Sequence, residues 1–251
     1  MDWQARWPTL RPIVDRIRLP VSCVVCGCLS DTEDCLCTVC ESTLPWITRA
    51  CPGCAISLPA IGSTVALCGQ CIKPAPILDH CQALMHYETP ARQLITTFKF
   101  HRGLAEGRVL GTLLGRKMKD HYAGSNAARL LIPVPLHRRR LRDRGFNQAV
   151  ELARRVEFLA DIPMAATVID RVLDTPSQRE LPARQRIRNL NGAFRVRNPE
   201  LLQRFQKVII IDDVMTTLST IQSLTLTIKA AGVPAVDAWA IARVTPGRQI
   251  E

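Results

Sequence analysis

The chain has 251 residues, of which 47% are hydrophobic and 22% charged, and its formal net charge at pH 7 is +11. This composition is typical of a globular protein and excludes a disordered chain, and the length suits one domain of moderate size plus a smaller one. No apolar run approaches the ~20 residues of a membrane span. The basic balance favours an anionic partner, either a nucleic acid or a small polyanion.

The first 20 residues contain charged residues and prolines at short intervals. They therefore lack the continuous apolar stretch of a signal peptide, so we expect an N-terminal extension over residues 1–20 and a cytoplasmic protein.

All eleven cysteines precede residue 82. Eight of them form four Cys-x-x-Cys pairs, Cys23/Cys26, Cys37/Cys40, Cys51/Cys54 and Cys68/Cys71. Two residues between thiolates let both sulfurs bind one tetrahedral metal ion, and a second pair completes the site. In a cytosolic protein this spacing favours zinc over disulfides, so we predict two structural Zn²⁺ sites in a double zinc-ribbon domain at 21–73. Cys28, Cys35 and Cys81 are expected to be small buried residues, with Cys35 an alternative ligand to Cys37.

A Pro-rich hinge, Lys73-Pro74-Ala75-Pro76, follows the last cysteine pair. Beyond it, apolar strands alternate with amphipathic helices, which indicates an α/β domain with an open, mostly parallel sheet over residues 77–246. The expected strands are 80–87, 130–135, 168–173, 207–211 and 235–242. The expected helices are 90–98, 102–119, 147–159 and a stretch that begins near Ile221.

Two Arg-rich segments interrupt this alternation. Residues 132–148 begin as a strand, continue as a cationic loop and end at a helix start. The carboxyl ends of parallel strands meet at one edge of a sheet, so this loop could hold a pyrophosphate there. Residues 175–194 are polar and have no strand pattern, which favours a mobile lid. For each segment a solvated charged loop is the alternative interpretation.

The strand Val208–Ile211 delivers two adjacent carboxylates, Asp212 and Asp213, to a turn rich in Thr and Ser that precedes a helix. Unpaired N–H groups and the helix dipole favour a phosphate at such a helix start. The carboxylates suit ribose hydroxyls or Mg²⁺. A ribose 5-phosphate that carries a pyrophosphate would use both the carboxylate pair and the phosphate site at the helix start.

The run Val208–Thr220 resembles the phosphoribosyl-pyrophosphate (PRPP) motif of type I phosphoribosyltransferases, except that Leu218 replaces the usual Gly. Gly at a phosphate loop permits positive φ, and a Leu in that conformation costs about 1–2 kcal/mol. Either the loop keeps negative φ with the Leu turned outward, or phosphate binding is weakened.

Further sequence motifs resemble those of the ComF family, which includes ComFC-type competence proteins and GntX-type proteins. They are Pro133–His137, Arg144–Gln148, the Gln178…Phe194 stretch, Leu94-Ile95…Lys99-Phe100 and the four cysteine pairs. This resemblance implies a double zinc ribbon joined to a type I phosphoribosyltransferase fold, and a link to the uptake of transforming DNA.

The resemblance also implies roles at the site. Mg²⁺-PRPP would place its 5-phosphate on the N–H groups of Leu218, Ser219 and Thr220 and on the hydroxyls of Thr216, Thr217 and Thr220. Asp212 and Asp213 would hold the ribose hydroxyls. Arg138, Arg139, Arg140 and Arg144, with Arg186 from the lid, would neutralise the leaving pyrophosphate. The expected catalytic residues are thus Asp212, Asp213, Arg144 and Arg186.

Three functions remain open. The first is phosphoribosyl transfer to an unknown acceptor. Thr216 stands where hypoxanthine-type enzymes carry an Asp, which argues against purine salvage. The second is non-catalytic binding of PRPP or a nucleotide, with the zinc ribbon docking competence proteins. The third is handling of single-stranded DNA by the Arg-rich segments, which would depend steeply on salt. Few aromatic residues lie near those segments, so a base-stacking platform has little support.

Overall fold

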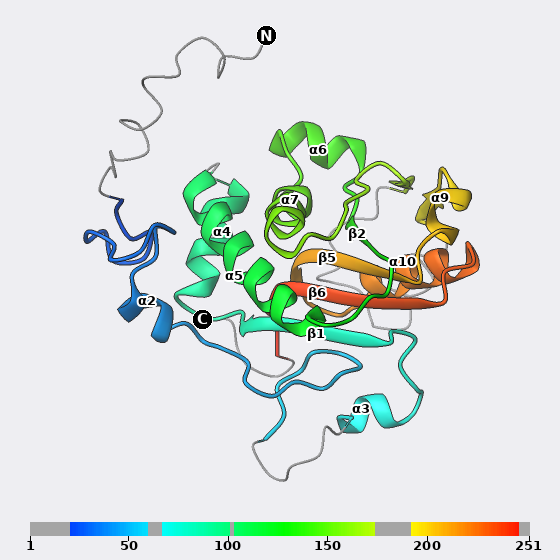
Figure 1. Cartoon of the computed structure of the whole chain (residues 1–251), viewed down its shortest axis with the longest axis horizontal. Coiled ribbons are helices and arrows are strands. Elements are labelled where there is room, and N and C mark those ends of the chain that lie inside the picture. The colour runs from blue at the N-terminus through cyan, green and yellow to red at the C-terminus, as the bar shows by residue number, and fades with distance from the viewer. Residues whose placement is uncertain (1–20, 60–66, 101–102, 174–191, 246–251) are drawn as a thin grey trace. The chain divides into compact units, whose positions relative to one another are not determined.

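A computed structural model describes residues 21–59, 67–100, 103–173 and 192–245 (Figure 1). The chain forms two compact units, one ending at Thr43 and the other beginning at Leu44. The expected domain limits, 21–73 and 77–246, remain a prediction, because this division falls between the two halves of the cysteine-rich region. Within the described ranges, no helix is long and apolar enough to cross a membrane.

An open four-stranded parallel sheet forms the centre of the larger unit. Its strands lie in the order β1 (His80–His86), β6 (Ala235–Arg243), β5 (Lys207–Met215) and β2 (Arg129–Pro133). The apolar residues of β5 and β6 are almost all buried, as expected for parallel strands covered on both faces. These four strands were all predicted, and β5 extends four residues further than expected because its last residues still pair with β6.

Helices cover both faces of this sheet (Figure 1). α4 (Ala91–Phe100), α5 (Leu104–Tyr122) and α7 (Gln148–Ala160) lie on one face, and α10 (Ser219–Ala230) lies on the other. This distribution follows from right-handed connections, because the chain moves towards β2 through α5 and back towards β6 through α10. Gly111 and Gly115 let α5 approach α7 closely, since a Cβ at either position would meet Arg155 or Leu159 at 2.8–2.9 Å.

Several short elements were not predicted. The Arg-rich segment after β2 contains a helix, α6 (Arg138–Arg144), where the sequence indicated a loop. The His137 side chain caps its N-terminus, and Gly145 ends it in the left-handed conformation. β3 (Ile169–Arg171) lies within the expected strand 168–173, but it pairs in antiparallel fashion with β4 (Phe194–Val196) instead of joining the parallel sheet. β4 and α9 (Pro199–Gln203), which follows it, were not predicted. The expected lid between β3 and β4 lies mostly outside the described residues, as do the N-terminal extension and Arg186.

The segment at residues 45–58 lies along the outer edge of β1. Its backbone bonds to this strand at three places, where Ile47 N–H donates to Leu84, His86 N–H to Pro45 and Cys81 N–H to Pro52. The edge strand of the sheet is therefore partly paired by a segment that also carries cysteines.

A buried polar network lies at the amino end of the strands. Asp237 is fully buried, and its carboxylate accepts hydrogen bonds from Lys207 Nζ at 2.9–3.1 Å and from the Tyr122 hydroxyl at 2.7 Å. The Tyr122 hydroxyl oxygen in turn accepts from Trp239 Nε1 at 3.0 Å. Each buried polar group thus has a partner, and the network fixes α5 against β5 and β6.

Replacing Tyr122 with Phe should lower the free energy of unfolding by about 2–3 kcal/mol, because it removes a donor from a buried carboxylate and leaves Trp239 Nε1 without its acceptor. Urea denaturation measures this difference. Tyr87→Phe, at the only other tyrosine of the chain, is the matched control. An equal effect of both substitutions would mean that the network does not stabilise the fold.

Candidate functional site

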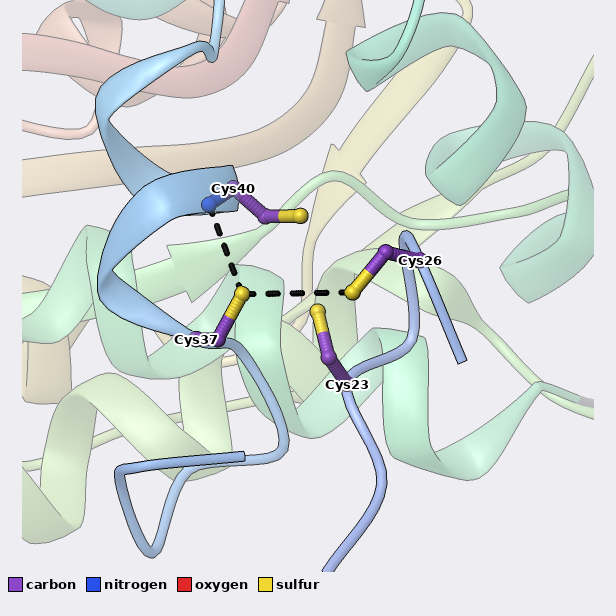
Figure 2. A group of neighbouring side chains, drawn as sticks. All are labelled: Cys23, Cys26, Cys37 and Cys40. Carbon is purple, nitrogen blue, oxygen red and sulfur yellow. Dashed lines mark hydrogen bonds between the residues drawn. The ribbon is translucent and has the colours of Figure 1, made fainter. Parts of the chain in front are cut away.

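The first cysteine cluster, Cys23, Cys26, Cys37 and Cys40, belongs to the smaller unit (Figure 2). All four Sγ atoms lie within 4.8 Å of one another, and Cys26 Sγ is 4.0 Å from Cys37 Sγ. A tight turn supplies one pair, and the start of α2 (Thr38–Ser42) supplies the other. Cys37 is a member of this cluster and Cys35 is not.

The second cysteine cluster, Cys51, Cys54, Cys68 and Cys71, belongs to the same unit as the sheet. Cys54 Sγ is 3.5 Å from Cys68 Sγ, and Cys71 lies in the short helix α3 (Gly69–Ile72). Tetrahedral zinc with Zn–S bonds of 2.3 Å requires sulfurs about 3.8 Å apart, so both clusters can hold a Zn²⁺ ion.

The leftover cysteines only partly match expectation. Cys81 is fully buried in the core, as predicted. Cys28 is exposed and Cys35 half-buried, so the prediction of burial is wrong for these two, because the turns that form the first cluster leave them at its surface.

The paired carboxylates lie on the last part of β5. Asp213 forms an ion pair with Lys99 of α4, with 3.0 Å between Nζ and Oδ1, and both side chains are largely buried. Asp212 Oδ1 accepts from the Asp213 N–H at 2.9 Å. Desolvation, together with the neighbouring charge of Asp213, raises the pKa of Asp212 to about 7. Near neutral pH this carboxyl group is therefore poised between its two charge states.

The loop after β5 adopts the conformation that its resemblance to phosphate loops requires. Leu218 has φ 61° and ψ −4°, and its side chain is buried in the core. Of the two alternatives, negative φ with the Leu turned outward is wrong, because burial of the side chain offsets the backbone strain. The other alternative, weakened phosphate binding, stays a prediction. α10 starts directly after Leu218 and has no side-chain cap at its N-terminus.

A cavity of about 180 Å³ lies beside the carboxylates. Among the predicted residues, Asp212, Asp213, Thr220, Arg140 and Arg144 line it together. The other loop residues lie next to it in sequence, with Thr216 and Thr217 exposed and Ser219 buried. Arg138 and Arg139 are on the exposed side of α6, and Arg138 lines a larger neighbouring cavity instead.

Sequence reasoning gave no role to four polar residues that also line this cavity, Lys99, Asn147, Gln148 and Arg171. Gln148, the first residue of α7, is 2% exposed. Its Oε1 accepts from Arg144 Nη1 at 3.1 Å, whereas its buried Nε2 has no hydrogen-bond partner among the residues that the structure describes. A buried donor without an acceptor is costly, so Nε2 is suited to a ligand oxygen. Lys99 and Gln148 both lie in the motifs that resemble the ComF family, and that resemblance was the signal that could have identified them.

The chain is similar to curated proteins along most of its length, although no protein-family model matches it. Competence protein F of Haemophilus influenzae is 31% identical over 88% of this chain and 96% of its own length. The chain belongs to the competence protein F family. DNA utilization protein YhgH of Escherichia coli is 31% identical over 83% of this chain and 90% of its own. A solved hypoxanthine phosphoribosyltransferase from Staphylococcus aureus is 14% identical over 57% of this chain and 65% of its own, with a TM-score of 0.35.

Two substitutions at Leu218 separate backbone strain from burial. Leu218→Gly should lower the free energy of unfolding by about 1–3 kcal/mol, because lost burial outweighs relief of the strain. Leu218→Ala loses similar burial and keeps the strain, so it should be less stable than the Gly variant by about 1 kcal/mol. Denaturant unfolding of both proteins compares them. An Ala variant that is more stable than the Gly variant would show that the left-handed conformation does not persist.

Proposed function

We propose that this protein binds Mg²⁺-PRPP in the cavity beside β5 and transfers the phosphoribosyl group to an acceptor. We propose further that this reaction is part of DNA uptake. The observation that carries the proposal is one cavity shared by a carboxylate pair, three arginines, a lysine and a glutamine whose Nε2 has no partner among the described residues. The names of the relatives, competence protein F and DNA utilization protein, support the biological context.

The ribose half of the ligand would lie against Asp212 and Asp213. Carboxylates are good acceptors for the 2- and 3-hydroxyls of a sugar. Oxygen donors of this kind also fit Mg²⁺, which would supply positive charge to the pyrophosphate oxygens. Lys99, now paired with Asp213, lies close enough to contribute a second positive charge at the same place.

The 5-phosphate would lie on the loop between β5 and α10. Ser219 and Thr220 begin α10, whose first N–H groups have no acceptor within the helix. The hydroxyls of Thr216, Thr217 and Thr220 are further donors, and the left-handed conformation of Leu218 is the one that glycine supplies in related motifs.

The pyrophosphate, which is the leaving group of the transfer, would lie towards α6 and α7. During transfer, the bond between C1 of the ribose and the pyrophosphate oxygen breaks, and the electron pair leaves with the pyrophosphate. A nucleophilic atom of the acceptor then forms the new bond to C1. Arg140, Arg144 and Gln148 would stabilise the developing charge on the leaving oxygens, which is usually the largest contribution in such chemistry.

Substitution of the carboxylates tests the ribose site. Asp212→Asn and Asp213→Asn should each weaken Mg²⁺-PRPP binding at least about tenfold, because each removes a charged acceptor. The wild-type affinity should also fall about tenfold from pH 8 to pH 6, since the pKa of Asp212 is about 7 and protonation removes its charge. Calorimetry at several pH values measures both effects.

Two controls accompany this measurement. Asp212→Asn should abolish the dependence of affinity on pH, and Asp120→Asn, at an exposed acid on α5, should leave affinity unchanged. Wild-type protein that does not bind Mg²⁺-PRPP at pH 8 would refute the proposal.

Gln148→Met keeps the size of the side chain and removes its N–H donors. We expect it to weaken binding of PRPP and of free pyrophosphate about fivefold to tenfold, and to leave ribose 5-phosphate binding almost unchanged, because in the proposed arrangement Nε2 would donate to the leaving pyrophosphate. Competition binding with the three ligands measures, for each ligand, the ratio of wild-type to variant affinity. Equal losses for all three would assign Gln148 a structural role.

A second candidate function, non-catalytic handling of single-stranded DNA, has support from the larger cavity of about 750 Å³. Five arginines line it, Arg138, Arg154, Arg171, Arg195 and Arg197. Its two carboxylates, Glu151 and Asp170, already pair with Arg154 and Arg197 at 2.6 Å, so the cavity keeps an excess of positive charge. Oligonucleotide affinity that falls steeply between 50 and 200 mM salt, without PRPP turnover, would favour this function.

A further inference from the structure

Arg243 is a buried cation that joins two parts of the larger unit. It is the last residue of β6, where it is paired in register with Met215 of β5, and only 4% of it is exposed. Its Nε donates to the carbonyl oxygen of Cys54 at 2.8 Å. Its Nη1 donates to the carbonyl oxygens of Met215 at 3.0 Å, of Thr216 and of Val244 at 2.8 Å.

These contacts connect the second cysteine cluster to the start of the candidate phosphate loop. Cys54 belongs to the turn of that cluster, and Thr216 is the first residue of the loop after β5. One guanidinium therefore fixes the direction of two consecutive carbonyl groups where β5 ends. Its planar shape holds several acceptors in a set geometry, which the flexible ammonium of a lysine does not do.

A second connection runs parallel to the first. The Cys81 N–H donates to the carbonyl oxygen of Pro52, in the same cluster turn, at 2.7 Å. The Cys81 thiol lies 3.6 Å from the sulfur of Met215 in the buried core. The cluster turn thus meets the end of β5 both through Arg243 and through Cys81.

The charge of Arg243 and the charge of a zinc-loaded second cysteine cluster are complementary. The four hydrogen bonds of the Arg243 guanidinium within the described residues all end on neutral carbonyl groups. A buried guanidinium stays charged and needs negative charge nearby. Four thiolates around one Zn²⁺ carry a net charge of −2, so a metal-loaded second cluster supplies this charge next to Arg243.

We infer that the second cysteine cluster, when it holds zinc, positions the loop after β5 through Arg243, so that loss of this metal loosens the loop. Arg243 is then a positioning residue. The first cluster belongs to the other unit of the chain and serves as the comparison. The inference extends the proposed function, because it makes the ligand site sensitive to metal supply and to thiol oxidation.

Hydrogen exchange of the full-length, ligand-free protein tests the inference. Cys71→Ser removes a ligand of the second cluster, and Cys40→Ser removes the corresponding residue of the first. Each variant should retain about one zinc per chain by elemental analysis, against about two in the wild type. Amide exchange at residues 222–225, whose N–H groups are the first of α10 to find acceptors at the end of this loop, should accelerate at least about tenfold in Cys71→Ser and in Arg243→Met, and should not change in Cys40→Ser.

The amides of β2 provide an internal reference for global unfolding. If Cys71→Ser does not fold, a chelator titration of the wild type and the Arg243→Lys variant give the same comparison. Unchanged exchange at 222–225 after loss of zinc from the second cluster, with β2 still protected, would overturn the inference.

The ligand provides a reciprocal readout, which rests on the proposed function. Coupling between two sites acts in both directions. Mg²⁺-PRPP should therefore slow the release of zinc from the second cluster, measured in Cys40→Ser, and not from the first, measured in Cys71→Ser. Wild-type protein that fails to bind PRPP would refute the proposed function alone, because the exchange experiment contains no ligand.

Discussion

The carboxyl end of β5 has to meet two opposed requirements, and the rest of the larger unit is arranged around them. Its first residues are a fully buried apolar strand in the middle of the sheet, yet its last ones carry two adjacent carboxylates. Like charges at this separation repel strongly when water is scarce. Lys99 offsets one of them, and the raised pKa of Asp212 relieves the other, so the pair persists only because α4 and the surrounding loops supply its partners.

Much of this arrangement follows from local sequence. A run of β-branched residues identifies β5, and the spacing of eight cysteines predicts both clusters, because in each case the physical requirement involves residues close in the chain. The order of residues from Val208 to Thr220 likewise predicts a carboxylate pair followed by a helix start. These signals predict a carboxylate pair at the carboxyl edge of the sheet, and Asp212 and Asp213 lie there in the last part of β5.

The features that escaped prediction depend on residues far apart in sequence. Burial of Leu218 against the core outweighs its backbone strain, and no local preference reveals that balance. The unpartnered N–H of Gln148 exists because Arg144 occupies the other end of the same amide. Arg243 is one arginine among many in the sequence, and only the fold shows that it is buried between a cysteine cluster and a loop. The helix α6 was missed because a run of arginines was interpreted by its charge, although arginine is a good helix former.

The segment along the outer edge of β1 has a consequence for solubility. An uncovered edge strand presents free N–H and C=O groups to other chains and promotes aggregation. Here Pro45, Ile47 and Pro52 occupy part of that edge, and the second cluster closes the same segment into a compact turn. A fragment that begins at residue 77 would keep every strand of the sheet and lose this cover. By covering this edge, the cysteine-rich segment also limits self-association of the protein, whether or not a ligand is bound.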